Sequence, residues 1–325
     1  MANLRFSIFH TCALVFALGG LGQIQAIDLQ DKRVLILGDS ITQNGTYVSF
    51  VSYFLQKRNP NFNYDIVSIG LGSETVAGTS EADHPFPRPC IHTRLEEALK
   101  QVNPEIVFAC YGMNDGIYHP LGAKRFLDYQ DGINALIEKV AAANAQIILM
   151  TPPLFDASAK DRLSPSGSSY YSYKSPYENY NDVLRTYGKW ILLTELPVVA
   201  KVDLNSPMLE YNQSRRKTDP DFHLAKDGVH PGELGHLIMA IAILDSLGTA
   251  VQGDPANILA QTLADPLFSK INERRKLRSK GWLEFIGYER RERVKTDSVD
   301  EVELKAAELQ TAIDQLRRGT ELKLH

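Results

Sequence analysis

The sequence predicts an α/β protein in which a parallel sheet lies between two layers of helices, a three-layer α/β/α sandwich. Five short apolar runs alternate with longer helical stretches, and this alternation favours parallel strands joined by right-handed crossovers. The runs cover residues 33–37, 63–69, 104–111, 146–151 and 197–203. Helices are expected near 45–58, 91–101, 121–144 and 177–193, and from Pro231 to about Leu247. The alternation fixes the fold class but not the order of the strands.

The first apolar run, Val34 to Leu37, is typical of a strand buried on both faces. It ends at Gly38 and is followed by Asp39 and Ser40, so Ser40 is expected at the carboxyl edge of the sheet, where open α/β folds bind ligands. The alternative interpretation is a turn with no catalytic role, because Gly, Asp and Ser all favour turns.

The second and third runs are also followed by polar or glycine-rich blocks. Residues 68–75 form a Ser-Ile-Gly-Leu-Gly-Ser-Glu-Thr block, in which Gly70 and Gly72 allow backbone N–H groups to approach a substrate. Asn114 follows the third run, and its side-chain amide is a donor suited to a developing oxyanion. Both blocks are also compatible with plain turns.

The fourth block, Asp227-Gly228-Val229-His230-Pro231, places a carboxylate three residues before an imidazole. A serine nucleophile needs a base, and the base needs a third group to hold its tautomer. Asp227 and His230 supply both residue types, and Pro231 is suited to the first turn of a helix.

The four blocks, in this order, resemble those of the SGNH/GDSL hydrolase superfamily over roughly residues 33 to 245. The resemblance implies a flavodoxin-like sheet with five strands in the order 2-1-3-4-5. It also implies that Ser40 is the nucleophile, that His230 is its general base, and that Asp227 orients His230.

The resemblance further implies an oxyanion hole made by the Ser40 backbone N–H, the Asn114 side chain and a backbone N–H of the second block. Gly72 is the first choice for that donor, and Gly70 is the alternative. The second block departs from the family pattern at two points. Ser68 stands where asparagine is common, and the glycine spacing is shorter by one residue.

Two irregular segments follow predicted strands and are therefore expected to start at the carboxyl edge of the sheet. Residues 81–90 are rich in proline and hence stiff, and Arg88 within them is either a substrate contact or a surface arginine. Residues 152–180 are rich in Ser, Pro and Tyr, and such long loops are often functional. The tyrosines would stack on a sugar or line an acyl pocket, or else simply face solvent. Asp39 and Gly70 are further candidates for substrate binding.

The N-terminal residues 1–26 have the pattern of a secretory signal peptide cleaved after Ala26. An uncleaved membrane anchor is the alternative, although the apolar stretch is short and interrupted. Cys12 lacks a convincing lipobox, so no lipoprotein is predicted. The expected location is therefore secreted or periplasmic, without stable membrane insertion after cleavage.

Composition and cysteine content narrow the function classes. The net charge of −4 gives no reason to expect a nucleic-acid partner, because phosphate binding relies on dense Lys and Arg. No Cys/His spacing suggests a metal site, and no cofactor is expected. Cys90 and Cys110 would remain in the mature chain, either as a disulfide in an oxidising compartment or as buried free thiols.

Beyond residue 250 charged residues dominate, as in 272–276 and 289–293, where interleaved acids favour a solvated helix face. Ser298 and Glu301 form a capping box for a last helix. Its apolar seam is Val302, Ala306, Leu309, Ile313 and Leu316. The seam must cover the main core, a helix near 256–280 or a partner chain. The expected organisation is a catalytic domain over 27–250 and a helical extension over 251–325.

The resulting prediction is a secreted serine ester hydrolase that forms an acyl-enzyme on Ser40. Its substrate would be a small-molecule or glycan ester, and the tyrosine-rich loop favours removal of acetyl groups from carbohydrate. A lipase or lysophospholipase-like acylhydrolase is the first alternative, and it should have an apolar pocket near Ser40. A catalytically silent carbohydrate-binding module is the second.

Overall fold

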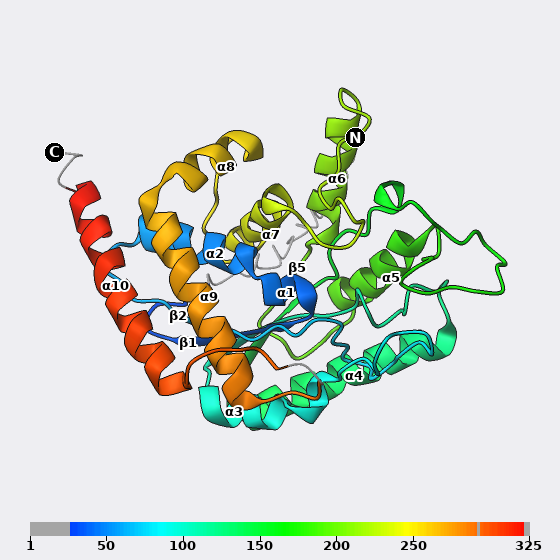
Figure 1. Cartoon of the computed structure of the whole chain (residues 1–325), viewed down its shortest axis with the longest axis horizontal. Coiled ribbons are helices and arrows are strands. Elements are labelled where there is room, and N and C mark those ends of the chain that lie inside the picture. The colour runs from blue at the N-terminus through cyan, green and yellow to red at the C-terminus, as the bar shows by residue number, and fades with distance from the viewer. Residues whose placement is uncertain (1–26, 291–292, 322–325) are drawn as a thin grey trace, which may run out of the picture.

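The computed structural model describes residues 27–290 and 293–321 and has a five-stranded sheet at its centre (Figure 1). All neighbouring strands pair in parallel, in the order β2-β1-β3-β4-β5, which confirms the predicted fold class and strand order. The strands are β1 Arg33–Gly38, β2 Asp65–Ser68, β3 Ile106–Cys110, β4 Gln146–Met150 and β5 Ala200–Val202. The predicted signal peptide, residues 1–26, lies outside the described residues.

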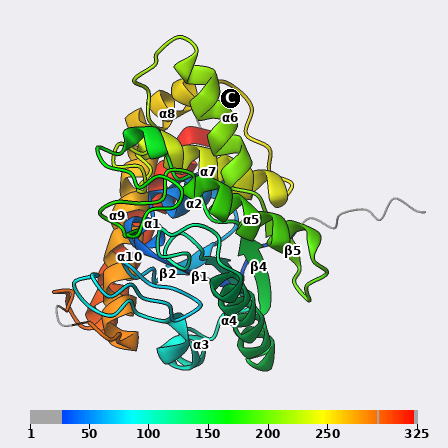
Figure 2. The same cartoon turned by 90° about the vertical axis from the view of Figure 1, so that its right-hand side faces the viewer.

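Helices cover both faces of the sheet, as Figures 1 and 2 show from two sides. One face carries α2 Thr46–Arg58, α7 Glu233–Ser246 and α9 Pro266–Ile286. The other face carries α3 Leu95–Val102, α4 Ala123–Ala142 and α5 Tyr180–Leu193. The remaining elements are α1 Ser40–Asn44, α6 Asn205–Arg216, α8 Pro255–Ala264, α10 Val299–Glu321 and two 3₁₀ turns, η1 Ile91–Thr93 and η2 Ala157–Ala159.

The central strands are buried because helices exclude water from both of their faces. Every residue of β3 is buried, and in β1 only Arg33 is exposed, which explains their continuous apolar sequences. Gly38 pairs with Cys110 at the carboxyl edge. A Cβ atom added to Gly38 would lie 2.9 Å from the Cys110 carbonyl oxygen, so this glycine lets the chain turn directly into α1.

Several helices differ from the sequence prediction. The short helix α1 and the polar helix α6 were not predicted. Helix α7 begins at Glu233 rather than Pro231. The helix expected near 256–280 is two helices, because Asp265 caps α9 and Pro266 occupies its first turn.

Helix α9 covers the open edge of the sheet at β2. Arg278, whose side chain is only 3% exposed, donates from Nη1 to the Ile66 carbonyl oxygen at 3.0 Å. The same guanidinium forms ion pairs with Asp65 (2.7 Å) and Glu303 of α10 (2.8 Å). A strand at a sheet edge exposes unpaired backbone groups, and Arg278 satisfies one of them.

Helix α10 packs on α9, so the predicted apolar seam covers a neighbouring helix of the same chain. Val302, Ala306 and Ile313 are fully buried, and Val302 lies against Gly281 of α9, where a Cβ atom would come within 2.7 Å. The capping box forms as predicted. Ser298 N–H donates to Glu301 Oε2 at 3.1 Å, and Glu301 N–H donates to Ser298 Oγ at 3.4 Å.

Both cysteines of the described chain are free thiols, so the alternative of a disulfide between Cys90 and Cys110 is wrong. Cys110 is buried in β3, and its Sγ lies 3.7 Å from the Thr151 carbonyl oxygen. None of the helices in the described part of the chain has the length and hydropathy of a membrane span.

Candidate active site

Ser40, His230 and Asp227 form one hydrogen-bonded chain. Ser40 is the first residue of α1, directly past β1, and its Oγ lies 2.8 Å from His230 Nε2. On the other side of the ring, His230 Nδ1 lies 2.6 Å from Asp227 Oδ2. The fold thus brings together two side chains that are 190 residues apart in the sequence.

The carboxylate of Asp227 also holds the loop that carries the histidine. Its Oδ1 accepts hydrogen bonds from the backbone N–H groups of Val229 (2.9 Å) and His230 (2.7 Å). Gly228, between Asp227 and Val229, has a φ of +80°, a left-handed conformation that favours glycine. The ring and its backbone are therefore oriented by a single side chain.

The pair also shapes the protonation of the histidine. Burial alone would raise the pKa of Asp227, but hydrogen bonds from the ring and backbone of His230 and from Val229 lower it overall. The hydrogen bond with Asp227 raises the pKa of His230 above its usual 6.5. In the neutral ring, Nδ1–H donates a hydrogen bond to Asp227, which leaves the unprotonated Nε2 to accept a hydrogen bond from the Ser40 hydroxyl.

Asp39 fixes the start of α1 rather than facing a ligand. It is 3% exposed, and its Oδ1 accepts a hydrogen bond from Ile41 N–H at 2.9 Å as the helix cap. Burial raises the pKa of Asp39 to about 6. The backbone N–H of Ser40 donates to no group among the described residues, so it remains available to a ligand.

The Asn114 side chain lies beside Asp39, the residue that precedes Ser40. Its Nδ2 is 3.4 Å from Asp39 Oδ2 and 3.2 Å from the Glu74 carbonyl oxygen. Its Oδ1 accepts hydrogen bonds from Arg88 Nη1 (2.9 Å) and the Tyr118 hydroxyl (3.4 Å). Because Arg88 can only donate, the amide oxygen of Asn114 must lie on the Arg88 side, and its NH₂ faces Asp39 and the Glu74 carbonyl.

Arg88 is buried behind Asn114, which differs from both sequence interpretations. Its side chain is 2% exposed and forms a two-pronged ion pair with Glu81, with both N–O distances at 2.6 Å. All three guanidinium nitrogens are engaged, so Arg88 neither contacts substrate nor faces solvent. Sequence reasoning missed this because Asn114 lies 26 residues away and meets Arg88 only in the fold.

The second block positions its two glycines differently. A Cβ atom on Gly70 would lie 2.3 Å from the Gln43 backbone nitrogen, so Gly70 lets this loop approach α1 closely. The Gly72 N–H donates to Gln43 Oε1 at 2.8 Å. Ser73 follows with a φ of +66°, and its N–H has no acceptor among the described residues. The sequence analysis did not single out Gln43 or Ser73. The only signal for them was the short glycine spacing, which marks this loop as unusual.

The two irregular segments meet each other at the carboxyl edge of the sheet. The Tyr170 hydroxyl lies 2.5 Å from Asp83 Oδ2, and the ring of Tyr173 contacts the edge of His84 with centroids 5.3 Å apart. Tyr180 does not contribute to this surface, because it is fully buried and donates to the Met113 carbonyl oxygen. The tyrosine-rich loop and the proline-rich segment therefore form one continuous wall.

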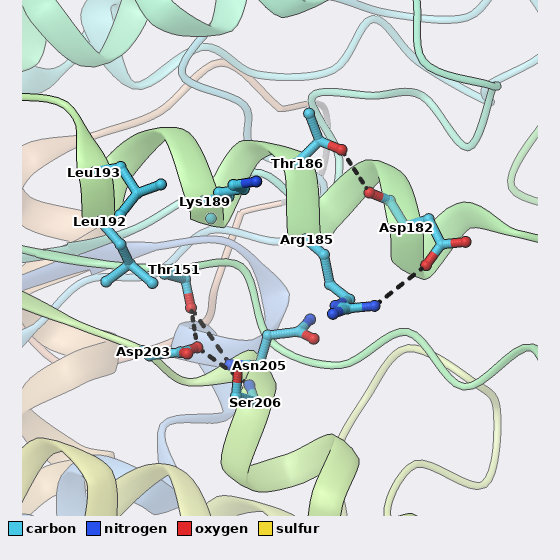
Figure 3. A pocket seen from close by; sticks show the side chains of 11 residues that line it. Thr151, Asp182, Arg185, Thr186, Lys189, Leu192, Leu193, Asp203, Asn205 and Ser206 are labelled. Carbon is cyan, nitrogen blue, oxygen red and sulfur yellow. Dashed lines mark hydrogen bonds and ion pairs between the residues drawn. The ribbon is translucent and has the colours of Figure 1, made fainter.

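A separate hollow of about 450 Å³ lies between α5 and the ends of β4 and β5 (Figure 3). Figure 3 shows that Arg185 points toward Asp182 and that Thr151 bonds to Asp203. None of Ser40, Asp227 and His230 lines it. Elsewhere, no three His, Cys, Asp or Glu side chains of the described residues converge as a metal site would require.

Comparisons with known proteins identify a family and a shared fold. Residues 36–238 match the model of the GDSL-like lipase/acylhydrolase family. No curated protein matches the chain. A gut microbial diltiazem-metabolizing enzyme has a similar structure, with a TM-score of 0.50 at 20% identity, over 69% of this chain and 49% of that chain.

Two further solved structures have lower scores. Axe2, an acetylxylan esterase from Geobacillus stearothermophilus, has a TM-score of 0.47 at 21% identity, over 69% of this chain and 98% of that chain. LAE5, an alpha/beta hydrolase enzyme from the metagenome of Lake Arreo in Spain, has a TM-score of 0.47 at 20% identity, over 69% and 99%.

Proposed function

The chain belongs to the GDSL-like lipase/acylhydrolase family and is a carboxylic ester hydrolase; from that premise we propose that it cleaves esters through an acyl-enzyme on Ser40. One observation carries the proposal, the continuous hydrogen-bonded chain from Ser40 Oγ through His230 to Asp227. In this arrangement a weak nucleophile has a base in contact, and the base has an orienting carboxylate.

In the first step, Ser40 Oγ attacks the ester carbonyl carbon while His230 Nε2 takes the hydroxyl proton. The carbonyl oxygen becomes an oxyanion, and the imidazolium formed is stabilised by Asp227. Collapse of the tetrahedral intermediate breaks the bond to the alcohol oxygen, which receives the proton from His230. A water molecule then attacks the acyl carbon while His230 takes its proton, the bond from the acyl carbon to Ser40 Oγ breaks, and His230 returns the proton to Ser40 Oγ as the acid product leaves.

The oxyanion hole in this proposal has three donors. The Ser40 N–H has no other acceptor in the described chain. Arg88 holds the Asn114 amide with its NH₂ beside Asp39, the neighbour of Ser40, and this NH₂ would exchange a hydrogen bond to Asp39 or Glu74 for one to the oxyanion. The third donor is the turn that contains Gly72 and Ser73. The Gly72 N–H donates to Gln43 Oε1 in this structure, so it can bind the oxyanion only if the Gln43 side chain moves aside. The Ser73 N–H has no acceptor among the described residues, so it can bind the oxyanion without such a movement.

The substrate class that we propose is an acetylated carbohydrate. The wall formed by residues 81–90 and 152–180 presents His84, Tyr170 and Tyr173, and rings with polar edges suit sugars better than alkyl chains. The sequence of residues 1–26 supports secretion or a periplasmic location. A long-chain acyl group would instead require an apolar pocket beside Ser40.

The test is to replace Ser40 with alanine and to compare both proteins on acetylated sugars and on p-nitrophenyl esters of increasing chain length. We expect no ester hydrolysis by Ser40→Ala with an unchanged melting temperature, and wild-type activity greatest on acetyl esters. A fluorophosphonate should label only the wild-type protein. Near-native turnover by Ser40→Ala would refute the mechanism, and a preference for long chains would replace the carbohydrate substrate by a lipid one.

A further inference from the structure

The extension beyond residue 250 reaches the active site through Arg290, which follows the C-terminal end of α9. A Cβ atom added to Gly72 would lie 3.1 Å from Arg290 Nη1 and 3.9 Å from Ser40 Cβ. The guanidinium and the proposed nucleophile therefore border the same glycine, on the loop that carries the proposed oxyanion donor. Arg290 is partly exposed, so it remains accessible from solvent.

An aromatic ring holds Arg290 in this place. Its guanidinium carbon lies 4.6 Å from the centroid of the Phe86 ring, close enough for a cation–π contact. The edge of the His84 ring meets Phe86 with centroids 4.6 Å apart, and His84 in turn contacts Tyr173. Arg290 is thus continuous with the wall that we propose to bind the sugar.

The charge of Arg290 is not neutralised by any residue that the structure describes, since it forms no ion pair there. Its neighbours behave differently. Arg293 pairs with Glu284 at 2.9 Å, and Arg88 pairs with Glu81. A guanidinium stacked on a ring keeps its in-plane N–H donors free for a planar or tetrahedral oxyanion.

The carboxylates near Ser40 are already engaged with protein groups and do not pair with Arg290. Glu74 is buried and paired with Arg94 at 2.7 Å. Asp39 is buried as a helix cap, and Asp227 is bonded to His230. Lys160 Nζ donates to the Asp227 carbonyl oxygen at 2.9 Å. Lys160 and Arg290 are therefore two cations near the proposed catalytic residues that form no ion pair among the described residues, and each can attract an anionic ligand.

We propose that Arg290 binds an oxyanion on the substrate, a carboxylate or a sulfate on the sugar that carries the ester, and so selects acidic glycan esters. This inference rests on the proposed function, because it places the ester at Ser40. The C-terminal extension is then part of the substrate-binding site.

The experiment compares kcat/KM on three O-acetylated methyl glycosides: a glucoside, a glucuronoside and a sulfated glucoside. We expect the wild-type protein to prefer one of the two acidic substrates, and the identity of that substrate tells carboxylate from sulfate. Arg290→Gln should lower the acidic-to-neutral ratio about 10- to 100-fold, the effect of losing a charge-assisted hydrogen bond. Rising salt should lower the wild-type ratio as well.

Arg293→Gln is the matched control, because Arg293 lies three residues away and its charge is already paired with Glu284. Its acidic-to-neutral ratio should equal that of the wild-type protein. An equal ratio in Arg290→Gln and Arg293→Gln would overturn the role of Arg290, while Ser40→Ala in the same assay tests the ester hydrolysis itself. The experiment therefore distinguishes a wrong role for Arg290 from a wrong assignment of ester hydrolysis to Ser40. Melting temperatures confirm that both arginine variants are folded.

Discussion

Arg88 Nη1 donates a hydrogen bond to Asn114 Oδ1 at 2.9 Å, and this bond decides which way the Asn114 amide faces. An arginine cannot accept, so the amide oxygen must lie on the Arg88 side and the NH₂ on the other. The ion pair with Glu81 fixes Arg88 in turn. Two buried charges thus orient one neutral donor.

Replacing Asn114 with alanine or aspartate should lower kcat by roughly 100- to 1000-fold with little change in KM, because either change removes one oxyanion donor. Aspartate keeps an acceptor for Arg88 and matches asparagine in size, but its carboxylate would face Asp39, so melting temperatures of both variants are needed to separate the lost donor from lost stability. Steady-state kinetics on a p-nitrophenyl acetate assay would measure both variants. A loss smaller than tenfold in both would remove Asn114 from the oxyanion hole.

The pH dependence of kcat/KM should report the His230–Asp227 pair. Only the neutral His230 accepts the serine proton, and its pKa is raised by Asp227, so activity should fall with decreasing pH from a midpoint above 6.5. Asp227→Asn removes the largest raising contribution, so the midpoint should move to lower pH. The plateau should drop roughly 100- to 10,000-fold because the ring loses its orienting acceptor.

Lys160→Met provides a control of opposite sign for this profile. The charge of Lys160 lowers the pKa of His230, so its removal should move the midpoint to higher pH. Midpoints that stay together in the wild-type protein and both variants would show that another group controls the acid side of the profile.

The two glycines of the second block should differ in their tolerance of alanine. A Cβ atom on Gly70 would lie 2.3 Å and 2.4 Å from backbone atoms of Gln43 and Thr42, so α1 would have to shift. We expect Gly70→Ala to cost roughly 1–3 kcal/mol of stability and most of the activity. At Gly72 the nearest atoms are side-chain ends, at 3.0 and 3.1 Å, so Gly72→Ala should melt near wild type. Urea unfolding measures both, and equal losses would contradict this reasoning.

Arg278→Ala should lower the free energy of unfolding by roughly 2–4 kcal/mol, because it leaves the buried Ile66 carbonyl without a donor and removes one ion-pair partner from each of Asp65 and Glu303. Asp65 would keep its ion pair with Arg33, and Glu303 its hydrogen bond from Trp282. The figure is below that for a fully buried pair, since Asp65 and Glu303 are about one-third exposed. Arg293→Ala, which breaks an ion pair of half-exposed groups, should cost less than about 1 kcal/mol. Similar urea midpoints for the two variants would show that the contacts of Arg278 do not stabilise the fold more than a surface ion pair does.

The strands and the four blocks could be predicted from the sequence, because each rests on a local signal. β1 and β3 are aliphatic runs buried on both faces, and the structure keeps them within a residue or two of the predicted ranges. Helix α1 escaped prediction because five residues give no periodicity, and only the Asp39 cap and the fold hold it.

Other features depend on contacts that no local pattern contains. Arg88 belongs to a proline-rich segment whose sequence is typical of a surface loop. In the fold its side chain is buried, where Glu81 neutralises its charge and the Asn114 oxygen accepts a hydrogen bond from it. Arg290 belongs to a charged run, 289–293, that reads as a solvated helix face. Its contact with Phe86, about two hundred positions earlier in the sequence, exists only because α9 returns along the sheet.

The position of α9 over β2 has a consequence for any shortened form of this protein. A chain cut after residue 250 would lose Arg278, Phe268 and Ile271, and it would expose both the outer strand and the apolar side of α2 to solvent. Free strand edges recruit further copies of the same chain. We therefore expect residues 27–250 to aggregate when they are produced without the C-terminal helices.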